Sequence, residues 1–94
     1  MKASDWTFDY KVVYQDRPER DGPLWTVVVK DDAQFGLFQN KVCVRFCVTV
    51  AALRRDFEEL TGTKIPKRPD PFMGCENIKE YRIMTGVYDT MEGN

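Results

Sequence analysis

The chain has 94 residues, of which 43% are hydrophobic and 31% are charged, with a net charge of −1 and no histidine. This length and composition predict one globular domain over residues 1–94 and exclude a disordered or fibrous chain. The absence of histidine excludes Ser–His and Cys–His nucleophile pairs and removes the commonest transition-metal ligand. The near-neutral charge gives no general attraction to nucleic acid or to an anionic membrane.

Two further features bear on where the protein acts. No stretch approaches the roughly 20 apolar residues of a membrane span, and the first twenty residues lack the apolar run of a secretory signal. The chain carries an odd number of cysteines, namely Cys43, Cys47 and Cys75. An odd count without a secretory signal predicts reduced thiols and a cytoplasmic location, with no membrane partner.

Alternating apolar residues predict the first two strands. Over residues 6–14 the apolar side chains recur with a period of two, typical of a half-buried strand: Trp6, Phe8, Tyr10, Val12 and Tyr14. We expect this aromatic face to lie in the core; the alternative is an exposed platform on which nucleic-acid bases stack. A polar loop over 15–23 follows, and residues 24–30 form the second predicted strand, with Trp25, Val27 and Val29 on one face.

Two shorter apolar segments predict the rest of the sheet. Residues 34–38 form a third strand and residues 41–48 a fourth, although a single strand over 36–48 is an alternative. In the fourth strand one face carries Val42, Val44, Phe46 and Val48. The opposite face carries both Cys43 and Cys47.

Residues 50–61 have the spacing of an amphipathic helix. Apolar residues recur at helical intervals at Val50, Leu53, Phe57 and Leu60. Thr49 is a good N-cap and Gly62 ends the helix. The outer face carries Arg54, Arg55, Glu58 and Glu59, and Arg54 and Glu58 are spaced for a weak helical ion pair.

The C-terminal third of the chain has no clear periodicity until residue 81. Residues 63–80 contain three prolines and form a long loop, which is often functional. Alternating apolar residues predict a last strand over 81–88, followed by a frayed polar tail over 89–94. The predicted fold class is α+β, a small antiparallel sheet of four to five strands with one amphipathic helix packed on one face, in the order β-β-(β)-β-α-β.

The sequence predicts no catalytic residues, no metal site and no cofactor. In an extended strand Cys43 and Cys47 lie about 13 Å apart, too far to share a metal ion or form a disulfide. Neighbouring carboxylates such as Glu58 and Glu59 point in different directions. The isolated glycines form no phosphate-binding loop. Arg45 lies between Cys43 and Cys47 and could favour the thiolate form of either one. A cysteine-dependent enzyme or redox switch is therefore one hypothesis for the function.

Basic residues gather in the middle of the chain. The stretch 41–70 contains seven basic and four acidic residues, and three of the cations lie within five positions of each other. Such an asymmetry is typical of a surface that contacts acidic groups. We predict that Arg54, Arg55, Lys64, Lys67 and Arg68 contact a partner through charge. Phe72 and Met73 are the predicted apolar anchors of the same surface, and aromatic and arginine residues dominate binding energy at interfaces generally.

These features favour a protein that binds without doing chemistry. Small size and the absence of motifs are typical of phage-encoded inhibitors and bacterial immunity proteins. The hypothesis is a non-catalytic protein–protein interaction module, an inhibitor or immunity/anti-defence type binder that occludes a macromolecular partner through a basic and apolar surface. The alternative is a small nucleic-acid-binding module that uses the basic 41–70 stretch. A homodimer is also possible, because one helix leaves the other face of the sheet open, including Val28 and Cys47.

Overall fold

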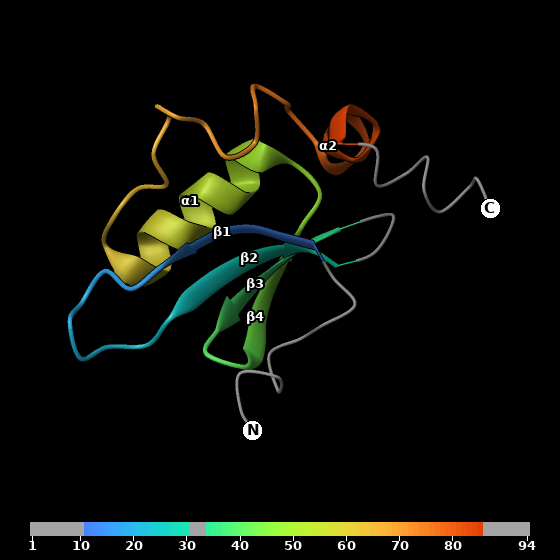
Figure 1. Cartoon of the computed structure of the whole chain (residues 1–94). Helices are drawn as coiled ribbons and strands as arrows, with labels where there is room; N and C mark the ends of the chain where they lie inside the picture. The colour runs from blue at the N-terminus through green and yellow to red at the C-terminus, as the bar shows by residue number, and fades with distance from the viewer. Residues whose placement is uncertain (1–10, 31–33, 86–94) are drawn as a thin grey trace.

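The structure is a computed structural model that describes residues 11–30 and 34–85. Within these ranges the chain forms four strands followed by two helices (Figure 1). The strands are β1 (Lys11–Asp16), β2 (Trp25–Val29), β3 (Phe35–Gln39) and β4 (Val42–Cys47), and the helices are α1 (Val50–Thr61) and α2 (Ile78–Thr85). The strands form one antiparallel sheet in the order β1-β2-β3-β4. The α+β class and the antiparallel sheet are therefore confirmed.

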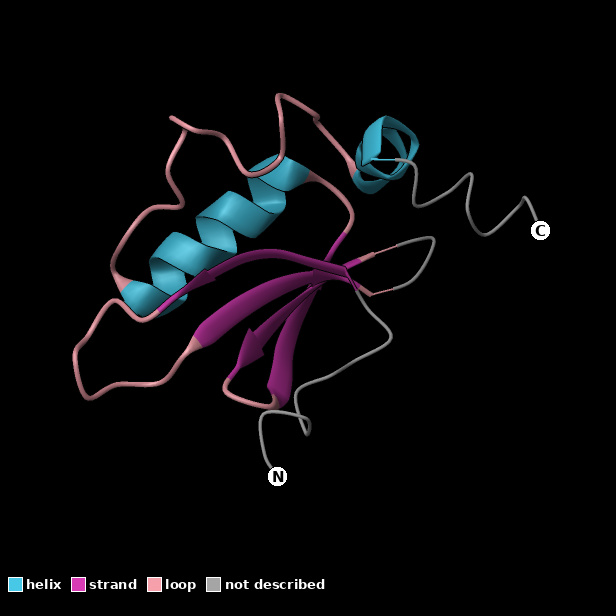
Figure 2. Ribbon diagram, in the orientation of Figure 1, coloured by secondary structure: helices cyan, strands magenta, loops and turns pink. Residues whose placement is uncertain are grey.

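The sheet and α1 form the two layers that contain the core. Helix α1 lies across one face of the sheet, and α2 lies beyond the N-terminal end of α1 (Figure 2). Every residue of the central strand β2 is buried, in keeping with its run of valines. Phe57 of α1 packs edge-on against Trp25 and Tyr14, with ring centroids 6.3 and 5.9 Å away. Burial of these aromatic side chains fixes α1 on the sheet.

The predicted second, third and fourth strands are confirmed to within two residues at each end. The alternative of one strand over 36–48 is wrong, because the chain reverses between β3 and β4 at Asn40. This residue has φ of +55°, a left-handed conformation that asparagine tolerates. Its side chain accepts a hydrogen bond from the Leu24 N–H at 3.0 Å. In the first predicted strand, residues 6–10 lie outside the described residues, and with them Trp6, Phe8 and Tyr10.

A register shift in β1 places two predicted neighbours on opposite faces. Val12 pairs with Val28, whereas Tyr14 pairs with Val27, so the shift lies between Val12 and Tyr14. Tyr14 packs against the core as predicted, but Val12 lies on the other face and is exposed. An extra residue in one strand reverses the alternation beyond it, which a strict period of two cannot predict.

A second shift changes the faces of β4. Leu37 pairs with Arg45 and the next residue, Phe38, pairs with Cys43. Val44 packs against the core, but Phe46 and Val42 are exposed, so the predicted common face is wrong. Cys47 lies in the core rather than on an open face. Val28 pairs with Val12 and lies outside the core cluster, on the predicted face, but it is fully buried, so that face is not open at this position.

Helix α1 has the predicted bounds and caps. The Thr49 hydroxyl accepts a hydrogen bond from the Ala52 N–H at 3.2 Å, and Gly62 adopts the left-handed conformation that ends the helix. The buried face carries Val50, Leu53 and Phe57. Local sequence signals were sufficient to predict α1, because the apolar spacing, the N-cap and the C-terminal glycine all indicate the same helix.

The predicted last strand over 81–88 is wrong over residues 81–85, because these belong to α2, and residues 86–88 lie outside the described residues. The Asn77 side chain accepts a hydrogen bond from the Glu80 N–H at 2.9 Å, which is the bond an N-cap makes. Ile78, Tyr81 and Arg82 are buried at helical spacing, and Tyr81 packs against Phe35 at 5.9 Å. The predicted tail over 89–94 lies outside the described residues. Neither helix in the described ranges has the length and apolar character needed to cross a membrane.

Candidate functional site

The segment between the two helices, residues 62–77, holds most of the predicted partner-binding residues and is called here the proline loop. It runs back along α1 towards the start of that helix (Figure 1). Three of its apolar side chains are buried in the core, those of Ile65, Phe72 and Cys75. At its far end, the Val50 N–H donates to the Glu76 carbonyl at 2.9 Å. The loop is therefore fixed to the domain at several points.

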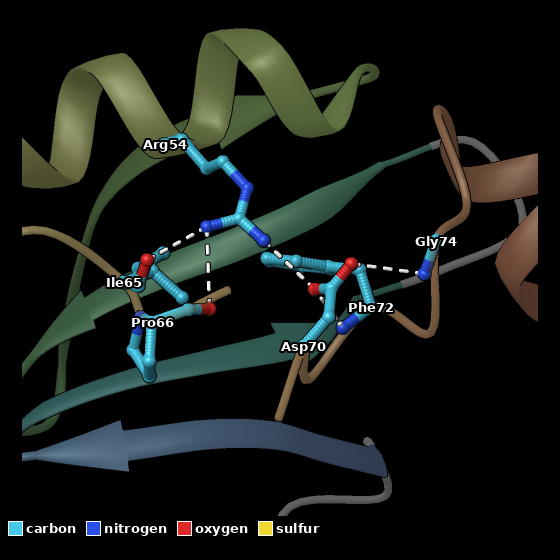
Figure 3. Close-up of polar contacts among 6 residues, drawn as sticks. All are labelled: Arg54, Ile65, Pro66, Asp70, Phe72 and Gly74. Carbon is cyan, nitrogen blue, oxygen red and sulfur yellow. Dashed lines mark hydrogen bonds and ion pairs between the residues drawn. The ribbon is translucent and has the colours of Figure 1, made fainter. Parts of the chain in front are cut away.

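Arg54 joins the proline loop to α1 (Figure 3). Its guanidinium donates to the Ile65 carbonyl at 2.7 Å and contacts the Asp70 carboxylate at 2.7 Å. It also lies over the Phe72 ring, 5.2 Å from the centroid. The side chain is only 19% exposed. Its donors are turned to the loop, and it bonds Asp70 instead of the predicted Glu58. A contact of Arg54 with a partner stays a prediction.

Asp70 organises the turn that follows. Its carboxylate accepts hydrogen bonds from the N–H groups of Phe72 and Gly74, both at 2.9 Å. Its carbonyl accepts from the Met73 N–H at 3.0 Å. Sequence reasoning missed Asp70, although an aspartate followed by proline and then by glycine is a turn signal. The carboxylate therefore links Arg54 on the helix to the backbone of the loop.

The two predicted apolar anchors have different environments. Phe72 is fully buried and packs against the rings of Phe35 and Tyr81 at 5.5 and 6.5 Å. Its prediction as a surface anchor is corrected, since its side chain belongs to the core. Met73 is 47% exposed and its backbone is left-handed, with φ of +55°. Of the two residues, only Met73 is available to a partner.

The remaining predicted cations lie on the surface. Lys64, Lys67 and Arg68 are exposed on the proline loop, and none of them forms an ion pair or hydrogen bond with another residue that the structure describes. We call these three residues the basic surface. Arg55 is 74% exposed on α1, and its nearest carboxylate oxygen belongs to Asp56, 3.8 Å away. The structure thus brings three of the five predicted cations together on one loop.

A groove runs between α1 and the proline loop. Its wider part has a volume of about 470 Å³ and is lined by Thr49, Val50, Ala51, Arg54, Lys67, Cys75 and Glu76. Its narrower part has a volume of about 160 Å³ and is lined by Arg54, Glu58, Lys64, Ile65 and Lys67. Arg54 and Lys67 border both parts, which we together call the α1 groove. Sequence analysis did not predict it, because its two walls are far apart in the chain.

The cysteine environments favour protonated thiols. Burial raises the pKa of Cys43 and of Cys75. Burial and the hydrogen bond to the Asp56 carboxylate raise the pKa of Cys47 to about 12. A nucleophilic cysteine needs a lowered pKa, so these environments disfavour the cysteine-dependent hypothesis. Within the described ranges, no three histidine, cysteine or carboxylate side chains are grouped so that they could hold a metal ion.

The basic stretch 41–70 is divided among separate elements. Lys41 lies in the turn before β4, Arg45 lies on β4, and the other cations lie on α1 and the proline loop. Compared with protein families, with curated proteins and with solved structures, the chain gives no match. What the chain binds therefore has to be inferred from its own side chains.

Proposed function

We propose that this chain is a non-catalytic protein–protein interaction module, of the small inhibitor or anti-defence type, that occludes an acidic macromolecular partner. The observation that carries the proposal is the clamp between Arg54 and Asp70, which fixes the proline loop while the basic surface stays exposed. We assign the contacts with this partner to Lys64, Lys67 and Arg68. Met73 is the apolar anchor, and Arg55 lies at the edge of the contact surface.

A fixed loop is a favourable way to present such a surface. Association costs free energy for every segment that becomes ordered, and the clamp reduces that cost before a partner arrives. Exposed cations without internal partners accelerate encounter with an acidic surface. Methionine is enriched at interfaces, where its flexible side chain adapts to different neighbours. The three free thiols agree with a proposed location in the reducing cytoplasm.

The test compares capture of protein partners from cell lysate by the full chain and by a charge-reversed variant. We expect the variant Lys64→Glu, Lys67→Glu, Arg68→Glu to lose about tenfold or more of the captured partner, measured by quantitative mass spectrometry. The matched control is Lys11→Glu, Lys79→Glu, Arg20→Glu, which makes the same change of net charge at exposed positions elsewhere. Equal loss in both variants, or no loss in either, contradicts the proposal.

The alternative, a nucleic-acid-binding module, uses the same basic surface. Phosphate contacts make the logarithm of affinity fall by about 0.9 per contact with the logarithm of salt concentration on duplex DNA. Light scattering of the protein with and without short DNA and RNA separates the two functions. A rise in mass only with nucleic acid, lost steeply with salt, would replace the proposed function with this alternative.

A further inference from the structure

The sheet has a second face, opposite α1, whose residues are identified by the strand register. Both helices pack into the core on the other side of the sheet (Figure 2). On the face opposite them, strand pairing places two rows of residues across all four strands. The first row contains Val12, Val28, Gly36 and Phe46. The second row contains Gln15, Thr26, Phe38 and Cys43. We call these eight residues the outer face.

The outer face is closed at its centre and exposed at its two edges. Val28 is fully buried, and an atom of the Phe38 ring lies 3.2 Å from the position that a Cβ atom of Gly36 would take. At the edges of the same row, Val12 on β1 is 46% exposed and Phe46 on β4 is 50% exposed. Three strand spacings separate these two side chains, a distance of about 14 Å. Whatever covers the outer face therefore has to cross all four strands.

The outer face is too small to hold a second protein by itself. Four strands and two rows of side chains give a patch of about 20 by 15 Å, or about 300 Å². Burial of this area on both partners removes about 600 Å², whereas a stable interface buries about 1,200 Å² or more. A segment of the same chain is not subject to this limit, because its effective concentration at the face is about millimolar or higher. The area therefore favours an occupant from this chain over a second copy of it.

The segment that precedes β1 has matching dimensions. Residues 1–10 come directly before Lys11, where β1 begins at the edge of the sheet. Within this segment Trp6, Phe8 and Tyr10 alternate with polar residues, so their rings would lie on one side of an extended chain. Four residue steps separate the first ring from the last, which is about 13 Å in an extended chain. This length agrees with the distance between the two exposed edges of the outer face.

The sheet gives these rings no place in a straight continuation of β1. Lys11 pairs with Val29, which is the last residue of β2. A straight strand before Lys11 would therefore run past the end of β2 and leave its aromatic side chains in water. Folding over the outer face gives them apolar neighbours instead, and each buried aromatic side chain removes about 150–250 Å² from water.

We propose that residues 1–10 fold back over the outer face as a strap, with Tyr10 beside Val12 and Trp6 against Phe46. The strap covers the apolar edges of the sheet and closes the second face of the domain. This inference does not depend on the proposed function. It assigns the outer face to the chain itself and leaves the basic surface of the proline loop to the partner.

The first test measures how well Trp6 is protected in the full chain. Trp25→Phe leaves Trp6 as the only tryptophan. If the strap is open in at most about 10% of molecules, acrylamide should quench Trp6 about tenfold more slowly than it quenches a free peptide of residues 1–10. Quenching within about twofold of the rate for the free peptide overturns the inference.

Two matched variants in this background test whether the outer face provides the protection. Phe46→Asp places a charge under the strap and should restore the quenching of Trp6 to the level of the free peptide. Val42→Asp places the same charge on the same strand at a position that is 64% exposed, but on the opposite face, because Val42 pairs with Gln39. It should leave the quenching unchanged. Thermal unfolding checks that both variants fold, and continued protection of Trp6 in folded Phe46→Asp overturns the inference.

A measurement on the unaltered chain does not depend on any variant. Nuclear Overhauser cross-peaks between the Trp6 indole and the Phe46 ring are expected, in a sample whose light scattering gives the mass of one chain. A mass of two chains would assign the outer face to a second copy and overturn the inference. A single chain without these cross-peaks also overturns it, and leaves the outer face to a different partner.

Discussion

Arg54 and Arg55 are adjacent in α1 but have different roles. Successive helical side chains point in directions about 100° apart, so Arg54 is turned to the proline loop and Arg55 to solvent. Both were predicted as partner-binding cations, because residue type and charge do not distinguish them. The difference is decided by Asp70, which lies 16 residues further along the chain.

This difference in role predicts a difference in stability. Arg54→Ala should lower the free energy of unfolding by about 2 kcal/mol, because it removes partly buried hydrogen bonds that involve charged groups. Arg55→Ala should change it by less than about 0.5 kcal/mol, since its side chain is exposed. Urea denaturation measures both values. Equal effects of the two substitutions would show that Arg54 does not clamp the loop.

Phe72 and Met73 show how a turn separates neighbouring side chains. The Asp70 carboxylate holds the N–H groups of Phe72 and Gly74, so the backbone curls around it. Phe72 then lies against Phe35 in the core, whereas Met73 points to solvent. Sequence alone shows two apolar residues in a proline-rich loop, with no signal for which of them is buried.

At the scale of elements, α1 and α2 differ in how strongly local sequence specifies them. The signals for α1 agree with each other, and its bounds were predicted correctly. For residues 81–88 the alternation of apolar residues favoured a strand, but Asn77 and Glu80 are spaced as an N-cap and a first-turn acid. Helical spacing places Ile78 and Tyr81 together against the core, and this tertiary burial outweighs a short alternation.

Gly62 gives a prediction about how α1 ends. It has φ of +80°, and a Cβ atom added there would meet no atom within 4 Å. Gly62→Ala should therefore lower the free energy of unfolding by about 1 kcal/mol through backbone strain alone. Gly62→Asn should cost less, because asparagine tolerates this conformation. Urea denaturation of both variants checks the order, and an equal loss would contradict the explanation.

At the scale of the whole molecule, several ionisable groups lie in or beside the core: Cys47, Cys75 and Tyr81 are buried in it, Tyr14 packs against it, and Cys43 is half-buried. The three thiols, with the phenols of Tyr14 and Tyr81, all have pKa values raised first by burial. Each of these groups is neutral when protonated and negative when deprotonated. The folded state therefore favours the protonated form of each group more than the unfolded state does.

This burial predicts that the protein loses stability in alkaline solution. Between the ordinary pKa of 9.0 and the raised pKa of about 12, the Cys47 thiol binds more protons in the folded state than in the unfolded state. Its contribution to the free energy of unfolding is complete below about pH 9 and is lost as pH rises through that window. Urea denaturation at several pH values should show this decline. Cys47→Ala should make the decline shallower, and a stability that rises with alkaline pH would refute the prediction.

The sequence by itself determined the α+β class, three of the strands and α1 with both caps, because each depends on neighbouring residues and a short period. Tertiary structure alone decided the role of Arg54, the burial of Phe72 and the α1 groove. Each of these depends on contacts between the proline loop and other elements of the fold, whose residues are distant in sequence. The register shifts in β1 and β4 and the helical state of residues 78–85 were also decided by packing, which outweighs a local pattern wherever that pattern is short.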